Sequence, residues 1–238
     1  MPEQFDYSNL TGRPPGRVVR VLGALMPGVR TVQEQVTPYA RAWRRDNLGA
    51  LTARGPLWVA LGDSMSQGIG ATAHDRGWVG QLHDLLRADR PDLRLVNLSQ
   101  SGARLQDVLD DQLPALRELP SPVLTTLLIG SNDMVSHRYR GGARDRMREV
   151  LAALADLPGL KVVGTLPNPN RTAAGMSALA VRAAQQRGMA VAELREPRTT
   201  QWQGKLAPDH FHPNDAGYTS IAEVFADAIG PLSERVAG

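Results

Sequence analysis

The chain has 238 residues, 42% of them hydrophobic, and its 27 basic and 24 acidic side chains give a formal net charge of +3. The complete absence of cysteine excludes disulfides, thiolate metal sites, iron–sulfur clusters and a cysteine nucleophile. The small net charge, with only two Lys among the basic residues, does not indicate a nucleic-acid partner.

The N-terminal residues 1–55 differ from the rest in charge. They contain eight Arg and four acidic residues, a net charge of +4, so the remainder of the chain carries −1. Residues 18–26 and 29–43 are short amphipathic stretches separated by Pro27-Gly28. We expect residues 1–55 to be an Arg-rich extension that forms a helical arm on the rest of the protein. An alternative is peripheral membrane contact, with an Arg-flanked surface helix on anionic lipid.

The beginning of the chain lacks the features of a targeting signal. Its first ten residues are polar and acidic, without a basic segment followed by an apolar one. The apolar stretch at residues 18–26 is interrupted by Arg20 and is far shorter than the ~20 residues that span a bilayer. We therefore expect a cytoplasmic protein.

From residue 57 onward, short apolar runs alternate with segments of helical periodicity. One such segment has Trp78, Leu82, Leu85 and Leu86 at helical spacing, and the last helix has Ile221 and Phe225 on one face. The predicted strands are residues 57–61, 93–98, 123–129, 160–166 and 189–194. Strands that alternate with helices and are apolar on both faces indicate a parallel sheet covered on each side. We expect one α/β domain over residues 56–238.

Small polar blocks follow the first three predicted strands, where a parallel sheet binds its ligands. A fourth lies near the end of the chain. The blocks are Gly62-Asp63-Ser64-Met65-Ser66, residues 97–102 (Asn-Leu-Ser-Gln-Ser-Gly), Gly130-Ser131-Asn132-Asp133 and Asp209-His210-Phe211-His212-Pro213.

In order and spacing, these blocks resemble those of the SGNH or GDSL-type hydrolases, from residue 57 to about residue 229. The resemblance implies a flavodoxin-like, three-layer α/β/α sandwich with a five-stranded parallel sheet. It also implies a serine esterase with Ser64 as nucleophile and no cofactor or metal. Asp209 and His212 would complete the catalytic triad, and the oxyanion hole would consist of the Ser64 and Gly102 N–H groups and the Asn132 amide.

The residues themselves support this chemistry. A serine hydroxyl becomes a good nucleophile only when a base takes its proton and a third group orients that base. We expect Ser64 at a strand-to-helix turn, His212 as the base, and Asp209 accepting from its Nδ1–H group. Ser66 occupies the position where the G-x-S-x-G elbow of α/β-hydrolases needs glycine. His210 is the main competitor of His212.

The oxyanion and substrate residues are predicted from their positions. Gly102 is expected because a side chain there would obstruct the approach of its backbone. Met134 and Trp202 are candidates for substrate binding. The arginines between residues 138 and 148 form either a solvated helix face or a positive rim for an anionic substrate.

The predicted reaction is hydrolysis of a carboxylic ester through an acyl-enzyme, on a small-molecule, lipid or glycan substrate. A carbohydrate O-deacetylase or an acyltransferase would use the same residues. A dinucleotide-binding module is an alternative of another class, prompted by Gly68-Ile69-Gly70, but Thr72 or Ala73 stands where the fingerprint needs its last glycine. The third hypothesis is a non-catalytic binding protein with the same fold. Acyl chain length, alcohol part and oligomeric state are not predicted.

Overall fold

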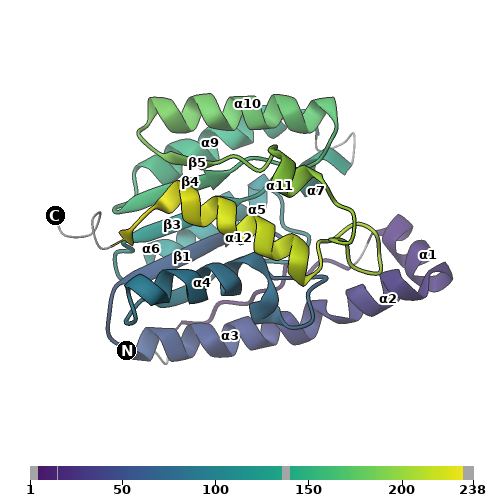
Figure 1. The fold of residues 1–238 in the computed structure, drawn as a ribbon, viewed down its shortest axis with the longest axis horizontal. Coiled ribbons are helices and arrows are strands. Elements are labelled where there is room, and N and C mark those ends of the chain that lie inside the picture. Colours follow the sequence, from purple (N-terminus) through teal and green to yellow (C-terminus); the bar gives the residue numbers. More distant parts are fainter. Residues whose placement is uncertain (1–4, 15, 136–139, 233–238) are drawn as a thin grey trace.

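Five strands form a single parallel sheet in a computed structural model that describes residues 5–14, 16–135 and 140–232 (Figure 1). Their order in the sheet is β2-β1-β3-β4-β5. The strands are β1 (Leu57–Gly62), β2 (Arg94–Asn97), β3 (Leu124–Leu128), β4 (Leu160–Gly164) and β5 (Ala190–Ala192). All five predicted strands are confirmed, and β1 runs one residue further than expected because Gly62 still pairs with Leu128.

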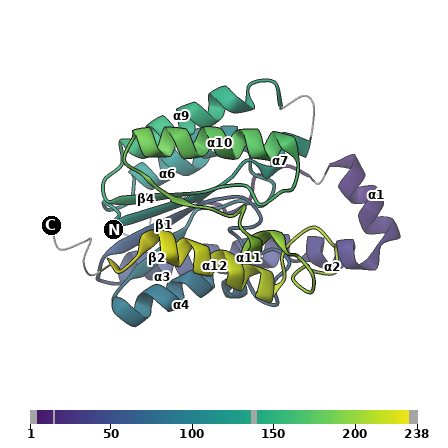
Figure 2. The ribbon, with the colours of Figure 1, turned by 45° about the horizontal axis from the view of Figure 1, so that its top comes forward.

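Side chains of β1 alternate between two apolar layers, as the pleat of a strand requires. Leu57, Val59 and Leu61 belong to one buried cluster, and Trp58 and Ala60 belong to the other. The first cluster is covered by α5 (Leu105–Asp107), α6 (Leu113–Arg117), α9 (Ala143–Ala155) and α10 (Arg171–Gln186), and the second by α4 (Trp78–Asp89) and α12 (Asp215–Ile229). Figure 2 shows these helices above and below the sheet, which confirms the predicted three-layer sandwich.

Two of the long helices begin at asparagine caps. The side chains of Asn170 and Asn214 accept hydrogen bonds from backbone N–H groups at the starts of α10 and α12. In the layer formed by α4 and α12, Phe225 of α12 stacks on Trp78 of α4 with ring centroids 4.2 Å apart. Shorter elements complete the fold, namely η2 (His74–Arg76), η3 (Val108–Gln112), α7 (Ser131–Val135) and α11 (Pro197–Thr200).

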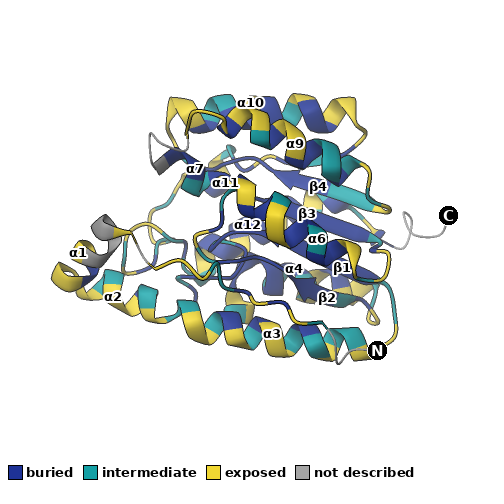
Figure 3. Ribbon diagram, turned by 180° about the vertical axis from the view of Figure 1, so that it is seen from behind, coloured by how far each residue is buried: buried dark blue, intermediate teal, exposed yellow. Residues whose placement is uncertain are grey.

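Three helices precede the sheet in the chain: α1 (Arg17–Leu25), α2 (Pro27–Glu34) and α3 (Val36–Thr52). Helix α3 packs along β2, and its Trp43 is buried in the same apolar cluster as the residues of α4 and α12. Its Asn47 side chain pairs with the backbone of Asn97 in both directions, donating to the carbonyl and accepting from the N–H group at 2.8 Å each. Helices α1 and α2 extend beyond the sheet, and Figure 3 shows the exposed surface of α1.

The segment before α1 is built into the protein beside the end of β2. The buried Tyr7 hydroxyl donates to the Leu98 carbonyl at 2.5 Å. Buried Asn9 donates to the carbonyls of Asn97 and Ser99 at 2.8 and 2.9 Å. Leu10 then forms a parallel bridge with Ser101. These contacts join residues about 90 positions apart in the chain.

No helix within the described residues is both long and apolar enough to cross a lipid bilayer.

Candidate active site

The topology of the sheet creates the site. The chain passes from β1 to β2 on one side and then to β3 on the other, so the connections that follow β1 and β3 diverge. A crevice forms at such a switch point, outside the carboxyl ends of the strands. Ser64 follows β1, Gly102 follows β2 and Asn132 follows β3, while Asp209 and His212 lie on the loop before α12.

The structure brings three of the predicted residues into one hydrogen-bonded line. His212 Nε2 lies 3.0 Å from Ser64 Oγ, and His212 Nδ1 lies 2.6 Å from Asp209 Oδ2. The Ser64–His212 contact joins residues 148 positions apart in the chain. The side chains of His212 and Asp209 are only 15% and 7% exposed, so they interact largely out of bulk water.

The environment of Asp209 determines which nitrogen of the histidine carries the proton. Burial acts to raise the pKa of this carboxyl, but hydrogen bonding to His212 and to two backbone N–H groups holds the pKa below its ordinary value. Those N–H groups belong to Phe211 and His212, each 3.0 Å from Asp209 Oδ1. The ionised carboxylate is an acceptor only, so Nδ1 of His212 is the donor and Nε2 faces the Ser64 hydroxyl as an acceptor.

Ser64 lies in a series of turns after β1. No helix begins directly after it, so the predicted strand-to-helix turn is wrong in this respect. Backbone hydrogen bonds run from Gln67 to Asp63 and from Ile69 to Ser64, and α4 begins only at Trp78. The turns bring Ile69 against the first turn of α12, where the buried Tyr218 hydroxyl donates to the Ile69 carbonyl at 2.6 Å.

Gly70 explains the glycine pair that prompted the dinucleotide alternative. A Cβ atom at Gly70 would lie 2.5 Å from the Pro213 carbonyl oxygen and 2.8 Å from the Cβ of His212, and its φ of +100° favours glycine. This glycine therefore allows the chain after Ser64 to pass directly against the His212 loop.

Gly102 follows β2, and its backbone conformation gives a second reason for glycine at this position. A Cβ atom would meet nothing within 4 Å, so crowding does not select glycine at this position. Its φ of +79° does, because that conformation is costly for any residue with a side chain. Within the described part of the chain, the N–H groups of Gly102 and Ser64 have no hydrogen-bond partner.

Asn132 links the connections that follow β1, β2 and β3. Its Nδ2 atom donates to the Ala103 carbonyl at 2.9 Å and makes a long contact of 3.5 Å with Asp63 Oδ2. The amide thus has one hydrogen committed to the loop of Gly102 and the other in a weak contact.

Two buried aspartates support the same loops. Burial raises the pKa of Asp63 to about 6, against hydrogen bonding from the Met65 N–H group and the nearby His212. Burial also raises the pKa of Asp133, whose Oδ2 atom accepts from the Leu105 N–H group at 3.0 Å. Asp63 bonds within its own turn, whereas Asp133 connects two distant loops, a contact that no local pattern reveals.

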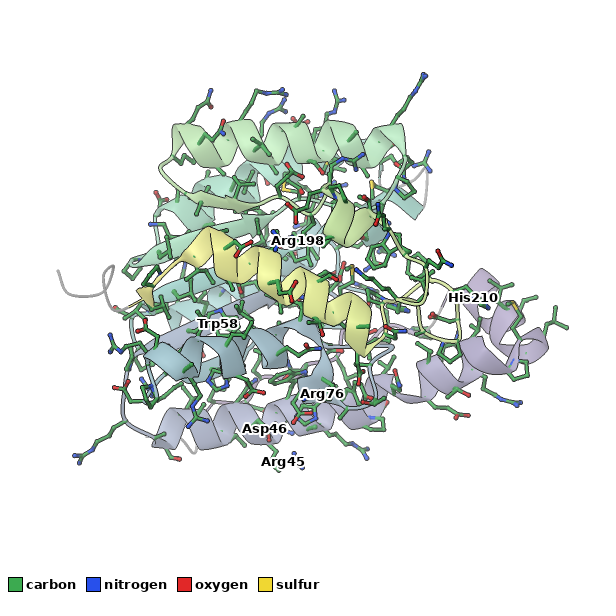
Figure 4. All side chains as sticks on the ribbon, in the orientation of Figure 1. Arg45, Asp46, Trp58, Arg76, Arg198 and His210 are labelled. Atoms are coloured by element: carbon green, nitrogen blue, oxygen red, sulfur yellow. The ribbon has the colours of Figure 1, made fainter. Side chains whose placement is uncertain are left out.

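His210 does not join the line of Ser64, His212 and Asp209. It is exposed, its φ is +55°, and its N–H group donates to the Ala207 carbonyl at 2.9 Å. Figure 4 labels His210 on the loop before α12, on the side of the molecule where α1 and α2 lie. The turn that it makes brings Phe211 and His212 back toward Asp209.

The two candidate substrate residues have different surroundings. Met134 of α7 is buried and lines a cavity of about 270 Å³ together with Arg140, Arg144 and Arg171. Trp202 packs, half-buried, against the apolar cluster of α4 and α12. His137 and Arg138 lie outside the described residues. Among the residues that are described, none of the His, Asp and Glu side chains form a group of three or more suited to a metal ion.

Sequence analysis missed the residues outside the four blocks that contact the Gly102 loop, namely Asn9, Arg13 and Gln67. Two of them lie in residues 1–55, far from any motif, and the only signal for Gln67 is its position three residues after Ser64.

Solved structures with the same fold include several ester-cleaving enzymes. The crystal structure of TesA is 24% identical, with a TM-score of 0.65, over 74% of this chain and 99% of that one. The psychrotrophic esterase EstA from Pseudoalteromonas sp. is 20% identical, with a TM-score of 0.61, over 74% and 97% of the two chains. A family 3 carbohydrate esterase of Clostridium thermocellum is 16% identical, with a TM-score of 0.59, over 78% and 100%. At these identities the likeness shows the fold.

Sequence comparison identifies the family. A search of curated protein sequences found no match. A family description, however, matches residues 60–219, which contain all four polar blocks and make up more than half of the chain. The protein is therefore a carboxylic ester hydrolase that belongs to the GDSL-like lipase/acylhydrolase family.

Proposed function

We propose that the protein cleaves its ester through an acyl-enzyme on Ser64. The observation that carries the proposal is the unbroken line from Ser64 Oγ through His212 to Asp209, with contacts of 3.0 and 2.6 Å. A serine aligned with an imidazole that is itself oriented by a buried carboxylate is the arrangement that activates a hydroxyl for attack.

Each residue has one task in this mechanism. Ser64 Oγ attacks the ester carbonyl carbon while His212 Nε2 takes its proton. The tetrahedral intermediate then expels the alcohol, which receives that proton from His212. Water attacks the acyl-enzyme with His212 again acting as the base, and the acid leaves as Ser64 recovers its proton. Asp209 stabilises the imidazolium that forms in both halves of the reaction.

The oxyanion of each intermediate needs donors that are already in place. In the proposal these are the N–H groups of Ser64 and Gly102 and the Nδ2 atom of Asn132. The two N–H groups without partners and the weak 3.5 Å contact of Asn132 with Asp63 support this assignment. We expect Asn132→Ala to lower kcat by ~10²–10³-fold. Ser131→Ala, which removes only a hydrogen bond to Asn168, is its matched control.

A fluorophosphonate probe tests the nucleophile directly. We expect one adduct per chain, located on Ser64 by mass spectrometry, and a loss of ~10³-fold or more in ester hydrolysis in Ser64→Ala. His212→Ala should lose a similar factor, while His210→Ala should retain most of the activity. Labelling of another serine, or equal losses in the two histidine variants, contradicts the proposed site.

The acyl acceptor is chosen by features beyond these residues, because the same chemistry serves hydrolysis, deacetylation and acyl transfer. p-Nitrophenyl esters of increasing chain length, followed by acetylated sugars, compare the substrate classes. Adding an alcohol acceptor and measuring the new ester against free acid separates transfer from hydrolysis. We expect free acid to be the main product.

We propose further that an anionic lipid surface presents the ester. On α1 and just after it, Val21, Leu22, Leu25 and Met26 are exposed, with Leu25 74% exposed. Phe211, between Asp209 and His212 in sequence, is 57% exposed. Residues 14–33 contain three Arg and no acidic residue, a composition that suits anionic headgroups.

The exposed apolar helix is connected to the catalytic loop. The first turn of α2 packs so closely on that loop that a Cβ atom at Gly28 would lie 2.2 Å from the Pro208 carbonyl oxygen. A membrane that received α1 would therefore meet the chain that carries His212.

Vesicle sedimentation tests this contact. We expect the protein to bind vesicles of phosphatidylglycerol and phosphatidylcholine more strongly than phosphatidylcholine alone, and a Leu22→Ser, Leu25→Ser variant to lose that binding. Leu85→Ser, which changes an exposed leucine on α4, is the matched control. Equal binding by both variants, or dimerisation through α1 in place of binding, contradicts the proposal.

A further inference from the structure

The loop that carries Gly102 is stabilised by residues outside the catalytic blocks. Gly102 has a left-handed backbone conformation and lacks a side chain that would pack and anchor it. Glycine has more backbone freedom than any other residue, and a catalytic donor must be aimed within about 0.5 Å. The direction of the Gly102 N–H group therefore depends on what binds the peptide groups on each side of it.

Gln67 binds the peptide between Gln100 and Ser101, which is one position before the peptide that carries the Gly102 N–H group. The Oε1 atom of Gln67 accepts from the Ser101 N–H group at 3.1 Å, and its Nε2 atom donates to the carbonyls of Ser99 and Asn9 at 2.9 and 2.7 Å. Gln67 is fully buried, so these hydrogen bonds are shielded from water. This side of the loop is therefore fixed from the turns that follow Ser64.

The peptide after Gly102 is bound by Arg13. Its Nη2 atom donates to the Gly102 carbonyl at 3.1 Å. The same guanidinium makes two hydrogen bonds of 2.6 Å to the carboxylate of Asp107. Asp107 also accepts from the Arg104 N–H group at 2.7 Å, so the guanidinium and this carboxylate span residues 102–107.

The geometry points to Arg13 as a positioning residue that aims the oxyanion-binding N–H group of Gly102 from outside the catalytic blocks. This inference rests on the proposed function, in which Gly102 is an oxyanion donor. Arg13 fixes the Gly102 carbonyl, and the ion pair with Asp107 fixes Arg13, so the loop cannot rotate about Gly102 without breaking three charge-assisted hydrogen bonds.

The ion pair differs from an ordinary surface pair. The side chains of Arg13 and Asp107 are 41% and 11% exposed, whereas those of the surface pair Arg44 and Asp6 are 52% and 90% exposed, so the difference lies in the buried carboxylate. Burial acts to raise the pKa of Asp107, but the hydrogen bonds from Arg13 and from the Arg104 backbone lower it below the ordinary value. Asp107 therefore remains an anion, and the forked geometry is specific to arginine.

Two variants of Arg13 and one control test the inference. Arg13→Met removes the charge and the hydrogen bonds to Gly102 and Asp107, while Arg13→Lys keeps a charge for Asp107 but lacks the fork that also reaches Gly102. Arg44→Met removes one arginine charge from the same N-terminal region without touching the loop. For each variant we measure kcat, KM, the thermal midpoint, and the affinity of an alkyl boronic acid, which forms a tetrahedral adduct on serine.

We expect Arg13→Met to lower kcat about tenfold with KM nearly unchanged, because a misaimed donor loses part of the 10²–10³-fold that an oxyanion donor supplies. The boronic acid should lose affinity by a similar factor. Arg13→Lys should recover the thermal midpoint and leave kcat reduced, which a merely structural role would not produce. Arg44→Met should match the parent in both measurements.

The inference is overturned if Arg13→Met equals Arg44→Met, or if Arg13→Lys recovers kcat together with stability. It is also overturned if KM rises and kcat stays constant. Failure of the proposed function gives a different result, since the parent would then be insensitive to the boronic acid and Ser64→Ala would remain active.

Discussion

Asp63 shows how one buried side chain beside the nucleophile couples stability to pH. It lies directly before Ser64, its Oδ1 atom accepts from the Met65 N–H group at 3.0 Å, and its other oxygen faces the Asn132 amide. Burial raises its pKa from 3.8 to about 6, against the lowering effects of the Met65 N–H group and of His212. The folded protein therefore binds this proton more tightly than the unfolded chain does.

We expect the contribution of Asp63 to folding stability to be full below pH 4 and to be lost as the pH rises through about 6. The pKa difference corresponds to about 3 kcal/mol. Urea unfolding between pH 4 and pH 7 should therefore show a steeper loss of stability in the parent than in Asp63→Asn. Parallel stability curves for the two proteins would show that the raised pKa is absent.

Among the elements, the loop before α12 is joined to its helix by a single side chain. Asn214 caps α12 by accepting from the Gly217 N–H group at 3.1 Å. Its amide nitrogen also donates to the carbonyls of Gly204 and Leu206 at 2.9 and 3.2 Å. Asp209 and His212 lie between these carbonyls and the cap, so the start of α12 anchors both ends of the segment that carries them.

Asn214→Ala should lower activity in addition to removing a helix cap. Loss of a cap alone costs ~1 kcal/mol, which is a fall of about 2–4 °C in the thermal midpoint for a chain of this size. Asn170→Ala removes the cap of α10, far from the loop, and is the matched control. We expect similar thermal shifts in both variants but lowered kcat in Asn214→Ala alone. Equal kcat in the two variants would show that the loop keeps its geometry without Asn214.

The chemistry at single residues was more predictable from sequence than the contacts between elements. Ser64, Asp209 and His212 lie in blocks whose residue types and spacing are those that catalysis by a serine nucleophile requires. The left-handed conformation of Gly102 was not predicted, because the sign of φ is a property of the folded loop. The bond from Asp133 to Leu105 was missed because it joins separate loops.

At the scale of the whole molecule, residues 5–52 contribute to the same folded unit as the sheet. Tyr7 and Trp43 are buried against residues of the sheet, and Asn47 pairs with the backbone of β2. The expected boundary between the extension and the α/β domain at residue 55 rests on charge and proline content, which are properties of the surface of this segment. Its buried residues meet partners 24 to 91 positions away, and such separations leave no local pattern.

A chain that begins at residue 54 should be far less stable than the whole protein. Loss of the buried Tyr7 and Trp43 alone costs on the order of 5 kcal/mol, which lowers the thermal midpoint by at least about 10 °C. Calorimetry of the full and shortened chains measures this difference. An unchanged midpoint would show that the segment before residue 54 contributes little to the stability of the fold.

The pairing of Asn47 with Asn97 has a consequence for the behaviour of the protein in crowded solution. Strand β2 is the outermost strand on its side of the sheet, and an uncovered outer strand is a template on which another chain can add its own backbone. The Asn47 side chain makes the donor and acceptor hydrogen bonds that a neighbouring strand would make. Tyr7 and Asn9 donate to the carbonyls of Leu98 and Ser99, which come next in the chain. The N-terminal segment thus protects the folded protein against aggregation through this edge.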